Sequence, residues 1–460
     1  MLRPRIPLGA LTPFFLFRMR ILVIGAGRST GSLIEYLLEH SGSMDATLVV
    51  ADRDLALAER KTGGHPRAQA VAFELGDADR LKSLVSECDL VVSMLPADLH
   101  LNVAIECIAQ GKHMVTASYL SAGMEALHEE ARNKGLILLN EIGVDPGIDH
   151  LSAVQILDRL RARGVEMRGF ESFTGGLPAP SSDNNPWNYK FTWNPRNVVL
   201  AGAGGAVKFI QEGQYKYIPY HQVFRRTEFF EVEGYGRFEG YANRDSLRYR
   251  SVYGLDSIPT IYRGTLRRPG YCRAWDVFVK LGMTDDSYRI EASGSMSWRQ
   301  FTNTFLAYHP TDSVELKFRH YIGIAQDDPM MDKFEWLGLF SNDPIGLENA
   351  TPAEILQKKL EEKWRLEPGE RDMIVMHHLF DFVEHGVAKR LTSSMVYEGL
   401  DDQRTAMAQT VGLPVGIAVR LILTQQIAQR GVLLPLHKEF YEPMLRELEG
   451  YGVRFVEREV

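Results

Sequence analysis

Short apolar runs rich in β-branched residues alternate with amphipathic segments along the first third of the chain. Between the runs, apolar residues recur every three or four positions, as in Leu33, Ile34, Leu37 and Leu38, which predicts helices that cover a sheet. Six of the runs are predicted to be strands: residues 21–24, 47–51, 70–73, 90–94, 113–116 and 136–139. This alternation predicts an α/β fold, a doubly wound parallel sheet of the Rossmann type.

The pattern changes at residues 141–150, E-I-G-V-D-P-G-I-D-H, where Gly143, Pro146 and Gly147 interrupt regular structure. We expect the chain to cross from one domain to another here. Residues 165–270 then combine short strands with loops rich in glycine, proline, asparagine and aromatic residues, which is typical of an α+β domain.

Residues 275–370 have mostly helical patterns. An amphipathic helix is expected at residues 354–364, started by Thr351 and Pro352. Two strands around a tight turn, a helix punctuated by Gly412 and Pro414, and a final strand follow, with expected bounds of 372–382, 389–397, 405–429 and 454–460.

Residues 1–18 precede the first predicted strand and carry Arg3 and Arg5 before an apolar stretch. Pro7 and Pro13 interrupt that stretch, and no small-residue cleavage site follows, so a signal peptide is not favoured. We expect a disordered extension, with Met19 as the functional start. No other run of about 18 apolar residues is found, so no membrane-spanning helix is predicted.

The charge balance restricts the classes of partner. Of 460 residues, 52 are Lys or Arg and 59 are Asp or Glu, a net charge of −7 that argues against binding to nucleic acid or anionic membranes. Cys88, Cys107 and Cys272 are widely spaced and form no C-x-x-C motif, so neither a disulfide framework nor a metal site is predicted. A reducing cytoplasm is the expected location.

A glycine-rich turn follows the first predicted strand and opens a helix. Glycines there allow a tight turn and let the backbone approach a pyrophosphate at the helix N-terminus. The spacing G-x-G-x-x-x-G is one residue longer than the commonest dinucleotide fingerprint. The predicted cofactor-binding residues in this turn are Gly25, Gly27, Arg28, Ser29, Thr30 and Gly31.

Two residues at the end of the second strand bear on which dinucleotide binds. Asp52 is placed to bind the ribose hydroxyls and repels a 2′-phosphate, whereas the neighbouring Arg53 would pair with that phosphate. The cofactor is therefore expected to be NAD or NADP, with a slight preference for NAD.

A second glycine run at residues 198–205 resembles the same fingerprint. No acidic residue at the end of a following strand supports it. We interpret it as small residues that let a helix pack closely.

Several longer motifs resemble the saccharopine reductase family, the glutamate-forming saccharopine dehydrogenases of lysine metabolism. They follow in the family's order and cover nearly all of the chain after Met19. The motifs are V-T-A-S-Y at 115–119, N-E-I-G-V-D-P-G-I-D-H at 140–150, G-G-L-P-A-P at 175–180, D-N-N-P at 183–186, Y-K-F at 189–191, N-R-D-S at 243–246, R-G-T-L-R at 263–267, W-L-G at 336–338, G-E-R-D at 369–372 and G-V-L at 431–433.

The resemblance implies three domains after the extension at 1–18. A dinucleotide-binding Rossmann domain would comprise residues 19–145 and about 400–460. An α+β domain for substrate and dimer contacts would comprise 146–274 and about 371–399, and a small helical domain would comprise 275–370. A homodimer is therefore expected.

The resemblance also implies a reaction, the reversible NAD(P)-linked conversion of saccharopine to L-glutamate and 2-aminoadipate 6-semialdehyde through an imine. Such an enzyme is an oxidoreductase of CH–NH donors. Positions that contact saccharopine in the family match Ser118, Tyr119, Asp145, Arg244, Thr265, Leu266 and Arg267.

This sequence departs from the family at two positions. Asp52 stands where relatives that use NADP commonly have an uncharged residue, which leaves the phosphate preference open. Thr174 replaces a cysteine that lies near the site in fungal relatives, so a thiol there is not essential in this chain.

Elementary chemistry is compatible with the same residues, although an arginine taken alone is more often a surface charge, and the resemblance is what favours the binding role. A substrate with three carboxylates needs guanidinium groups such as those of Arg244 and Arg267. Tyr119 follows the fifth strand and Asp145 the sixth, at the edge where open parallel sheets bind ligands, which makes them the candidate acid–base residues. His100 and His150 are interpreted as structural histidines.

Two alternative functions remain open from the sequence. Carboxynorspermidine dehydrogenase is a related enzyme that also reduces an imine, and a nucleotide-sensing protein would bind the cofactor without turnover. Retention of Tyr119, Asp145, Arg244 and Arg267 argues against the sensor, which needs no carboxylate-binding arginines.

Overall fold

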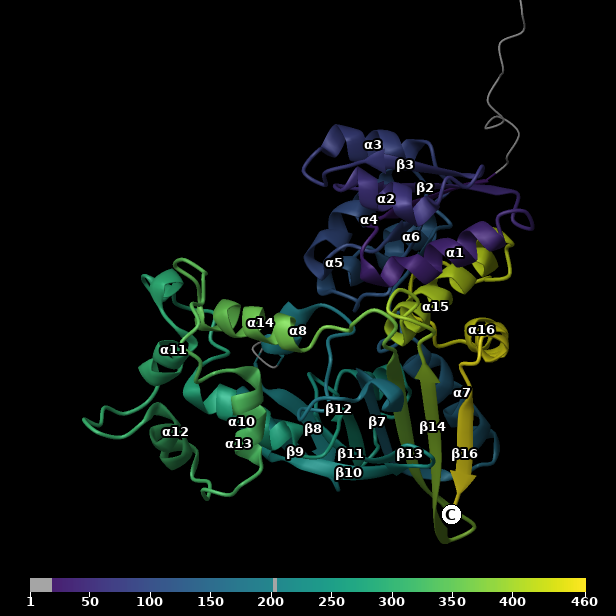
Figure 1. The fold of residues 1–460 in the computed structure, drawn as a ribbon. Helices are drawn as coiled ribbons and strands as arrows, with labels where there is room; N and C mark the ends of the chain where they lie inside the picture. The colour runs from purple at the N-terminus through teal and green to yellow at the C-terminus, as the bar shows by residue number, and fades with distance from the viewer. Residues whose placement is uncertain (1–18, 202–204) are drawn as a thin grey trace, which may run out of the picture. The chain divides into compact units, whose positions relative to one another are not determined.

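The computed structural model describes residues 19–201 and 205–460, which divide into two compact units (Figure 1). The first unit holds the described residues up to Gln155 together with Ala408–Tyr451, and the second holds Ile156–Met407 and Gly452–Val460. The predictions for residues 1–18 and for the core of the second glycine run, 202–204, lie outside the described residues.

A seven-stranded parallel sheet forms the first unit, with the order β15-β6-β5-β4-β1-β2-β3. The chain leaves β1 toward β2 and later returns to β4 on its other side, so the strand order reverses between β1 and β4, where such sheets bind ligands. The predicted Rossmann fold is confirmed. Its strands are β1 (Met19–Ile24), β2 (Ala46–Asp52), β3 (Ala68–Ala72), β4 (Leu90–Ser93), β5 (His113–Val115), β6 (Ile137–Leu139) and β15 (Gly431–Leu433).

Helices cover this sheet because each presents an apolar stripe to it, while Asp54 and Asp77 cap the N-termini of α2 and α3 through backbone N–H groups. The helices are α1 (Gly31–Glu39), α2 (Leu55–Thr62), α3 (Ala78–Ser86), α4 (His100–Ala109), α5 (Ala122–Glu125), α6 (His128–Asn133) and α16 (Lys438–Gly450). Two more, α7 (Ile148–Ala162) and α15 (Ala406–Leu423), contain the boundaries between the units.

Helix α15 corrects one prediction from the sequence. It continues through Pro414, and it is long and apolar enough to cross a membrane, although no such segment was expected. Because 78% of this helix is buried, its apolar character is explained by core packing. A Cβ atom added at Gly412 would lie 2.7 Å from the Leu33 backbone nitrogen, so glycine allows α15 to approach α1 closely.

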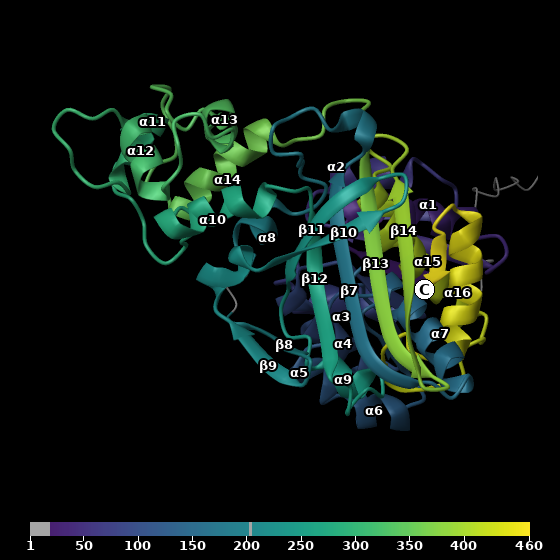
Figure 2. The same ribbon diagram turned by 90° about the horizontal axis from the view of Figure 1, so that it is seen from below.

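The second unit is built on a nine-stranded mixed sheet (Figure 2). Its main order is β10-β11-β12-β7-β13-β14-β16, with β8 and β9 forming a hairpin that joins β12. The strands are β7 (Glu166–Pro178), β8 (Val207–Gln211), β9 (Gln214–Ile218), β10 (Thr227–Val232), β11 (Gly236–Ala242), β12 (Thr260–Arg267), β13 (Asp372–Glu384), β14 (Val387–Glu398) and β16 (Phe455–Glu459).

The turn of the β13–β14 hairpin is as tight as the sequence predicts, and the last strand pairs with this hairpin. His385 and Gly386 both have positive φ, 50° and 79°, as a two-residue hairpin turn requires. The final strand exists as predicted, but β16 pairs with β14 in the sheet of the second unit, whereas the sequence assigned residues 454–460 to the dinucleotide domain.

Helices of the second unit share one aromatic core with its sheet, including the residues predicted as a separate helical domain. Trp187, Tyr271, Trp275 and Trp364 are fully buried and contact one another. The expected helix at 354–364 is α14 (Pro352–Lys363), with a capping box between Thr351 and Glu354. The others are α8 (Pro195–Val199), α9 (Tyr249–Val252), α10 (Tyr271–Leu281), α11 (Trp298–Thr304), α12 (Val314–Ile322) and α13 (Met330–Leu337).

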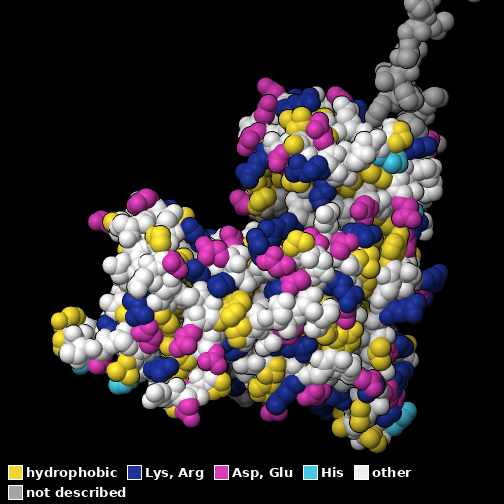
Figure 3. Space-filling view, viewed as in Figure 1, with side chains coloured by type: hydrophobic (Ala, Val, Ile, Leu, Met, Phe, Trp, Pro, Cys, Tyr) yellow, Lys and Arg dark blue, Asp and Glu magenta, His cyan; other side chains and the backbone are white. Residues whose placement is uncertain are grey.

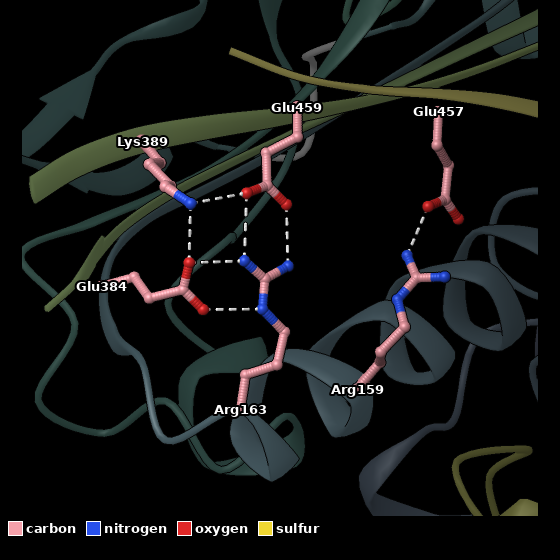
Figure 4. A network of polar contacts seen from close by, with 6 residues as sticks. All are labelled: Arg159, Arg163, Glu384, Lys389, Glu457 and Glu459. Atoms are coloured by element: carbon pink, nitrogen blue, oxygen red, sulfur yellow. Dashed lines mark hydrogen bonds and ion pairs between the residues drawn. The ribbon is translucent and has the colours of Figure 1, made fainter.

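An ion-pair network joins β16 to the rest of the second unit (Figure 4). The Arg163 guanidinium lies between the carboxylates of Glu384 and Glu459, with N–O distances of 2.7 to 3.0 Å. Lys389 binds the same two carboxylates, at 2.7 and 3.1 Å. On the face of the molecule shown in Figure 3, acidic and basic side chains are interspersed.

Candidate active site

The glycine-rich turn at the carboxyl end of β1 uses its glycines in two different ways. Gly25 has φ of 101°, and a Cβ atom there would lie 2.9 Å from the Met94 carbonyl oxygen, so the fold itself requires glycine. Gly27 is exposed, and a Cβ atom there would meet nothing within 4 Å. The fold therefore leaves the Gly27 backbone open to a ligand, which fits a dinucleotide pyrophosphate.

The turn leads directly into α1. Thr30 is buried and its hydroxyl donates to the Gly27 carbonyl at 2.8 Å, which fixes the end of the turn. Ser29 is half-buried, and Arg28 is exposed. The backbone N–H groups at the start of α1, which begins at Gly31, are the groups expected to face an anion.

Asp52 and Arg53 lie beside this turn but differ in their freedom to meet a ligand. One Asp52 oxygen accepts the Ala26 N–H at 2.6 Å, and the other accepts the Asp54 N–H at 2.9 Å. The Asp52 carboxylate thus ties the end of β2 to the glycine-rich turn. Arg53 is exposed at the same edge.

A buried hydrogen-bond chain connects β4 to the segment after β5. The Ser93 hydroxyl lies 2.8 Å from His100 Nδ1, and His100 Nε2 lies 2.6 Å from the Ser118 hydroxyl. Burial lowers the pKa of His100 to about 4, so its ring is neutral near pH 7. Both ring nitrogens are satisfied, as expected of a structural histidine, and the ring orients Ser118, a predicted substrate residue.

A second buried pair, Glu141 and His150, holds the segment after β6 against the start of α7. Glu141 Oε2 lies 2.8 Å from His150 Nε2, and Glu141 Oε1 accepts the Leu120 N–H at 2.9 Å. The Glu141 N–H donates to the Ser118 carbonyl at 3.0 Å. The residues on both sides of half-buried Tyr119 are therefore fixed by Glu141.

Asp145 lies in the tight turn between β6 and α7. A cis peptide bond joins it to Pro146, and the Gly143 N–H donates to the Pro146 carbonyl at 2.8 Å. A Cβ atom at Gly147 would lie 2.0 Å from the Gly143 carbonyl oxygen, so this turn requires glycine at 147. Asp145 itself is half-buried. The first unit thus brings Ser118, Tyr119 and Asp145 to the carboxyl ends of β5 and β6.

In the second unit, Thr265, Leu266 and Arg267 form the carboxyl end of β12. The Arg267 side chain is 4% exposed and lies over the rings of Tyr189, Tyr241 and Tyr271, with centroid distances of 4.8, 5.8 and 5.3 Å. Its Nη1 donates to the Leu266 carbonyl at 2.8 Å. Within residues 19–201 and 205–460, no carboxylate pairs with this guanidinium, so it carries a buried positive charge that suits an anionic ligand.

Arg244 occupies a different part of the second unit. It follows β11 with φ of 55°, and its side chain is exposed. The Asn243 N–H donates to the Arg263 carbonyl at 3.0 Å, which places Arg244 beside Arg263 and not beside Arg267. Along β12, Arg263 and Arg267 are separated by about 13 Å at 3.3 Å per residue.

Sequence reasoning assigned no role to Glu141, Tyr189 or Thr192. Glu141 and Tyr189 were visible only as letters within longer motifs, and no spacing rule marks them. Their importance follows from burial: Glu141 and Tyr189 are each 0% exposed and Thr192 is 5% exposed. The signal that the sequence itself carried was the presence of polar Glu141 and Tyr189 inside family motifs, whereas Thr192 lies just after such a motif.

Comparison with known proteins gives matches along almost the whole chain. Residues 21–139 match the family model described as saccharopine dehydrogenase NADP binding domain, and residues 143–453 match saccharopine dehydrogenase C-terminal domain. The chain is 34% identical to the saccharopine dehydrogenase (NADP(+), L-glutamate-forming) of Schizosaccharomyces pombe, over 95% of this chain and 98% of that protein.

Two further relatives extend this result. The Bos taurus mitochondrial alpha-aminoadipic semialdehyde synthase is 30% identical, over 95% of this chain and 47% of that longer protein. Among solved structures, the apo L-Glu-forming saccharopine dehydrogenase of Saccharomyces cerevisiae matches with a TM-score of 0.87 and 30% identity, covering 96% of this chain and 100% of that chain.

Proposed function

The chain belongs to the saccharopine dehydrogenase family, and we propose that it interconverts saccharopine with L-glutamate and 2-aminoadipate 6-semialdehyde in lysine metabolism. It is an oxidoreductase of CH–NH donors that uses a nicotinamide cofactor. The observation that carries the substrate assignment is the buried, carboxylate-free guanidinium of Arg267.

A substrate with several carboxylates explains why two arginines of the second unit lie at different places. Arg267 offers a desolvated guanidinium among three tyrosines at the end of β12, and Arg244, which follows β11 near Arg263, offers an exposed one. Two separate guanidinium groups suit an elongated molecule with carboxylates toward both of its ends. We assign one end of saccharopine to each arginine.

NADP is the cofactor we propose, which revises the slight preference for NAD drawn from Asp52. The related enzymes are named for NADP(+), and the matching domain is described as NADP binding. Both Asp52 oxygens already accept backbone N–H groups, so the carboxylate is held toward the turn. Exposed Arg53, next to it, is the proposed partner of the 2′-phosphate.

The cofactor proposal is tested by steady-state kinetics with NADP and NAD. We expect the unmodified enzyme to prefer NADP, and Arg53→Ala to lower kcat/KM for NADP roughly tenfold or more while leaving that for NAD unchanged. Equal efficiency with both cofactors, or an unchanged preference in Arg53→Ala, would contradict it.

The reaction demands proton transfer at the secondary amine. Glutamate keeps the nitrogen, so oxidation takes place at the carbon that becomes the aldehyde, and the bound nicotinamide supplies the hydride acceptor. The amine is protonated near neutral pH and must lose a proton before or during hydride transfer. Water then adds to the imine carbon, and the C–N bond breaks as the nitrogen takes up a proton.

Tyr119 and Asp145 are the proposed acid–base residues for these proton transfers. Each is half-buried and held on a segment that is fixed by backbone hydrogen bonds. Neutral His100 orients the Ser118 hydroxyl, and Arg244 and Arg267 hold carboxylates so that the reacting carbon is oriented.

The experiment that tests the function mixes the purified protein with NADP and saccharopine and follows the absorbance of the reduced nicotinamide. Arg244→Met is expected to raise the Michaelis constant for saccharopine steeply. Asp145→Ala and Tyr119→Phe are expected to lower turnover and alter its pH profile. Absence of saccharopine-dependent reduction, with carboxynorspermidine accepted in its place, would overturn the assignment.

We also propose that the enzyme is a cytoplasmic homodimer. The resemblance to the saccharopine reductase family implies dimer contacts through the α+β part of the second unit, where Phe229 and Val456 are 50% and 58% exposed. Cys88, Cys107 and Cys272 are buried free thiols, which suits a reducing compartment. Sedimentation velocity and cell fractionation test the two statements, and a monomer or an organellar location would contradict them.

A further inference from the structure

Among the buried polar atoms of the second unit that lack a well-formed hydrogen bond within the described residues, four gather around Arg267, although the Tyr189 hydroxyl also lies near the Trp193 side chain. The four atoms are Thr174 Oγ1, Tyr189 Oη, Thr192 Oγ1 and Arg267 Nε. The four residues are between 0% and 9% exposed. Buried polar groups are nearly always satisfied in folded proteins, and each unsatisfied one destabilises the fold, so a cluster of such groups around one charge calls for a ligand or an ordered water.

The strand register places these groups on one face of the β7–β12 pair. Thr174 on β7 is the register partner of Thr265 on β12, and side chains at alternate positions share a face, so Arg267 lies on the same side as Thr265. Gly176 shares that face with Thr174. A Cβ atom at Gly176 would lie 2.9 Å from Thr192 Oγ1, so Thr192 covers the strand at this point.

Tyr189 completes the group from the same connecting segment as Thr192. Its ring centroid lies 4.8 Å from the Arg267 guanidinium carbon. Burial raises the pKa of Tyr189, so the phenol stays protonated and can donate a hydrogen bond. A carboxylate also lies on this face. It belongs to Glu239, the register partner of Arg267 on β11, and it accepts the Cys272 N–H at 2.5 Å.

The chemistry of the four groups identifies the class of ligand. A guanidinium N–H, a phenol and two threonine hydroxyls can all act as donors, and they surround a positive charge that no carboxylate neutralises. An anionic acceptor satisfies every one of them, and a carboxylate matches the guanidinium geometry best.

We propose that Thr192 and Tyr189 are substrate-specificity residues that bind, together with Arg267, one carboxylate of the substrate. Thr174 lies on the same face and contributes a further hydroxyl. This inference rests on the proposed function, because it places a carboxylate of saccharopine in the second unit. It assigns Thr192 and Tyr189 a role in the selection of carboxylate-bearing substrates.

The test measures the unfolding temperature and the Michaelis constant for saccharopine together, because the loss of a purely structural hydrogen bond would lower the first and leave the second unchanged. Because the Thr192 hydroxyl has no hydrogen-bond partner among the described residues, Thr192→Val should unfold at the same temperature as the unmodified protein or higher, and Tyr189→Phe, which keeps the buried ring, should unfold close to it. Both should raise the Michaelis constant for saccharopine roughly tenfold or more, with that for NADP unchanged. Thr192→Ser should restore binding.

Thr302→Val is the matched control in the same unit. Thr302 is 0% exposed, but its hydroxyl donates to the Leu339 carbonyl at 2.8 Å. This variant should lose stability while the Michaelis constant for saccharopine stays unchanged, the reverse of the result expected for Thr192→Val.

The outcomes separate this inference from the proposed function. If the unmodified enzyme does not oxidise saccharopine, the proposed function fails. If it does, and both Thr192→Val and Tyr189→Phe keep the normal Michaelis constant, the inference is wrong and an internal water occupies the position. Thermal stabilisation by L-glutamate alone, reduced in both variants, would support it and place the glutamate part of the substrate there.

Discussion

His150 Nε2 lies 2.8 Å from Glu141 Oε2, and both side chains are 0% exposed. Glu141 also accepts the Leu120 N–H and donates its own N–H to the Ser118 carbonyl. One buried carboxylate therefore joins the start of α7 to both neighbours of Tyr119. The position of Tyr119, a candidate acid–base residue, thus depends on the Glu141–His150 pair, which has no role in the proposed proton transfers.

Replacement of Glu141 by alanine tests whether the position of Tyr119 depends on the Glu141 carboxylate. Glu141→Ala leaves the His150 ring and the Leu120 N–H without their partner, so we expect the free energy of unfolding to fall by about 3–5 kcal/mol. Turnover should fall in the protein that remains folded. Chemical denaturation and steady-state kinetics measure the two effects.

Glu129→Ala is the control for this change, because Glu129 forms an exposed ion pair with Arg132. It should change stability by less than about 0.5 kcal/mol. A similarly small effect of Glu141→Ala would show that the buried pair does not support the segment.

The two glycines of the dinucleotide turn should respond differently to a bulky side chain. Gly27→Val meets open space, so the free protein should keep its stability while NADP affinity falls at least roughly tenfold. Gly25→Val places a side chain against the Met94 carbonyl at positive φ and should destabilise the fold. Fluorescence titration and thermal unfolding measure these results, and unchanged affinity in Gly27→Val would refute the assignment.

The first sheet could be predicted because its strands are buried on both faces. Runs such as Val91 and Val92 in β4 read as continuous apolar segments, and all six predicted strands are present. The seventh, β15, is visible in the sequence only as the G-V-L motif, because it lies outside the run of alternating strands and helices and pairs with β6 from far along the chain. Strand β16 was recognised as a strand but assigned to the wrong sheet, because a local pattern does not identify its partner β14.

The helix expected at 405–429 is present as α15, which ends at Leu423 and continues through both residues expected to punctuate it. Gly412 and Pro414 are breakers by local propensity, yet tertiary packing against α1 overrides them, since Gly412 lies against the Leu33 backbone and Gly416 against the Tyr36 ring. Among candidate site residues, position next to a strand end predicted where Tyr119 and Asp145 lie, and their acid–base roles stay a prediction. Whether Asp52 faces a ligand depended on hydrogen bonds that no sequence pattern encodes.

The low pKa of His100 predicts a pH dependence of stability. Its folded pKa of about 4 lies below the ordinary value of 6.5, so the unfolded chain binds the proton more readily. The stability contribution is complete above about pH 6.5 and is lost as the pH falls toward 4. The total is on the order of 3 kcal/mol at about 1.4 kcal/mol per pKa unit.

His100→Gln removes this titration. Urea unfolding at pH 7 and pH 4.5 should show a smaller loss of stability for His100→Gln than for the unmodified protein. His221→Gln, at an exposed position, should show the same loss as the unmodified protein. An identical pH dependence in His100→Gln would contradict the burial argument.

The last prediction concerns the attachment of β16. Arg163 binds Glu384 at the end of β13 and Glu459 near the chain end, and Lys389 binds the same carboxylates (Figure 4). These contacts lower the pKa of both Glu384 and Glu459 to about 2. Because these folded pKa values are depressed, the network's contribution is present above about pH 4.5 and is lost as the pH falls toward 2.

Arg163→Ala leaves Glu384 and Glu459 facing each other with only Lys389 between them, so the outer half of β16 should open more often. Hydrogen exchange should show faster exchange of the β16 amides near Glu457 and Glu459 at pH 7, with β7 unaffected. High salt should reduce the difference, since the pairs are at the surface.

Arg168→Ala, which removes only an exposed pair with Glu166 on β7, should leave β16 exchange unchanged. Equal exchange in Arg163→Ala and the unmodified protein would mean that the backbone pairing of β14 and β16 holds the strand without the network.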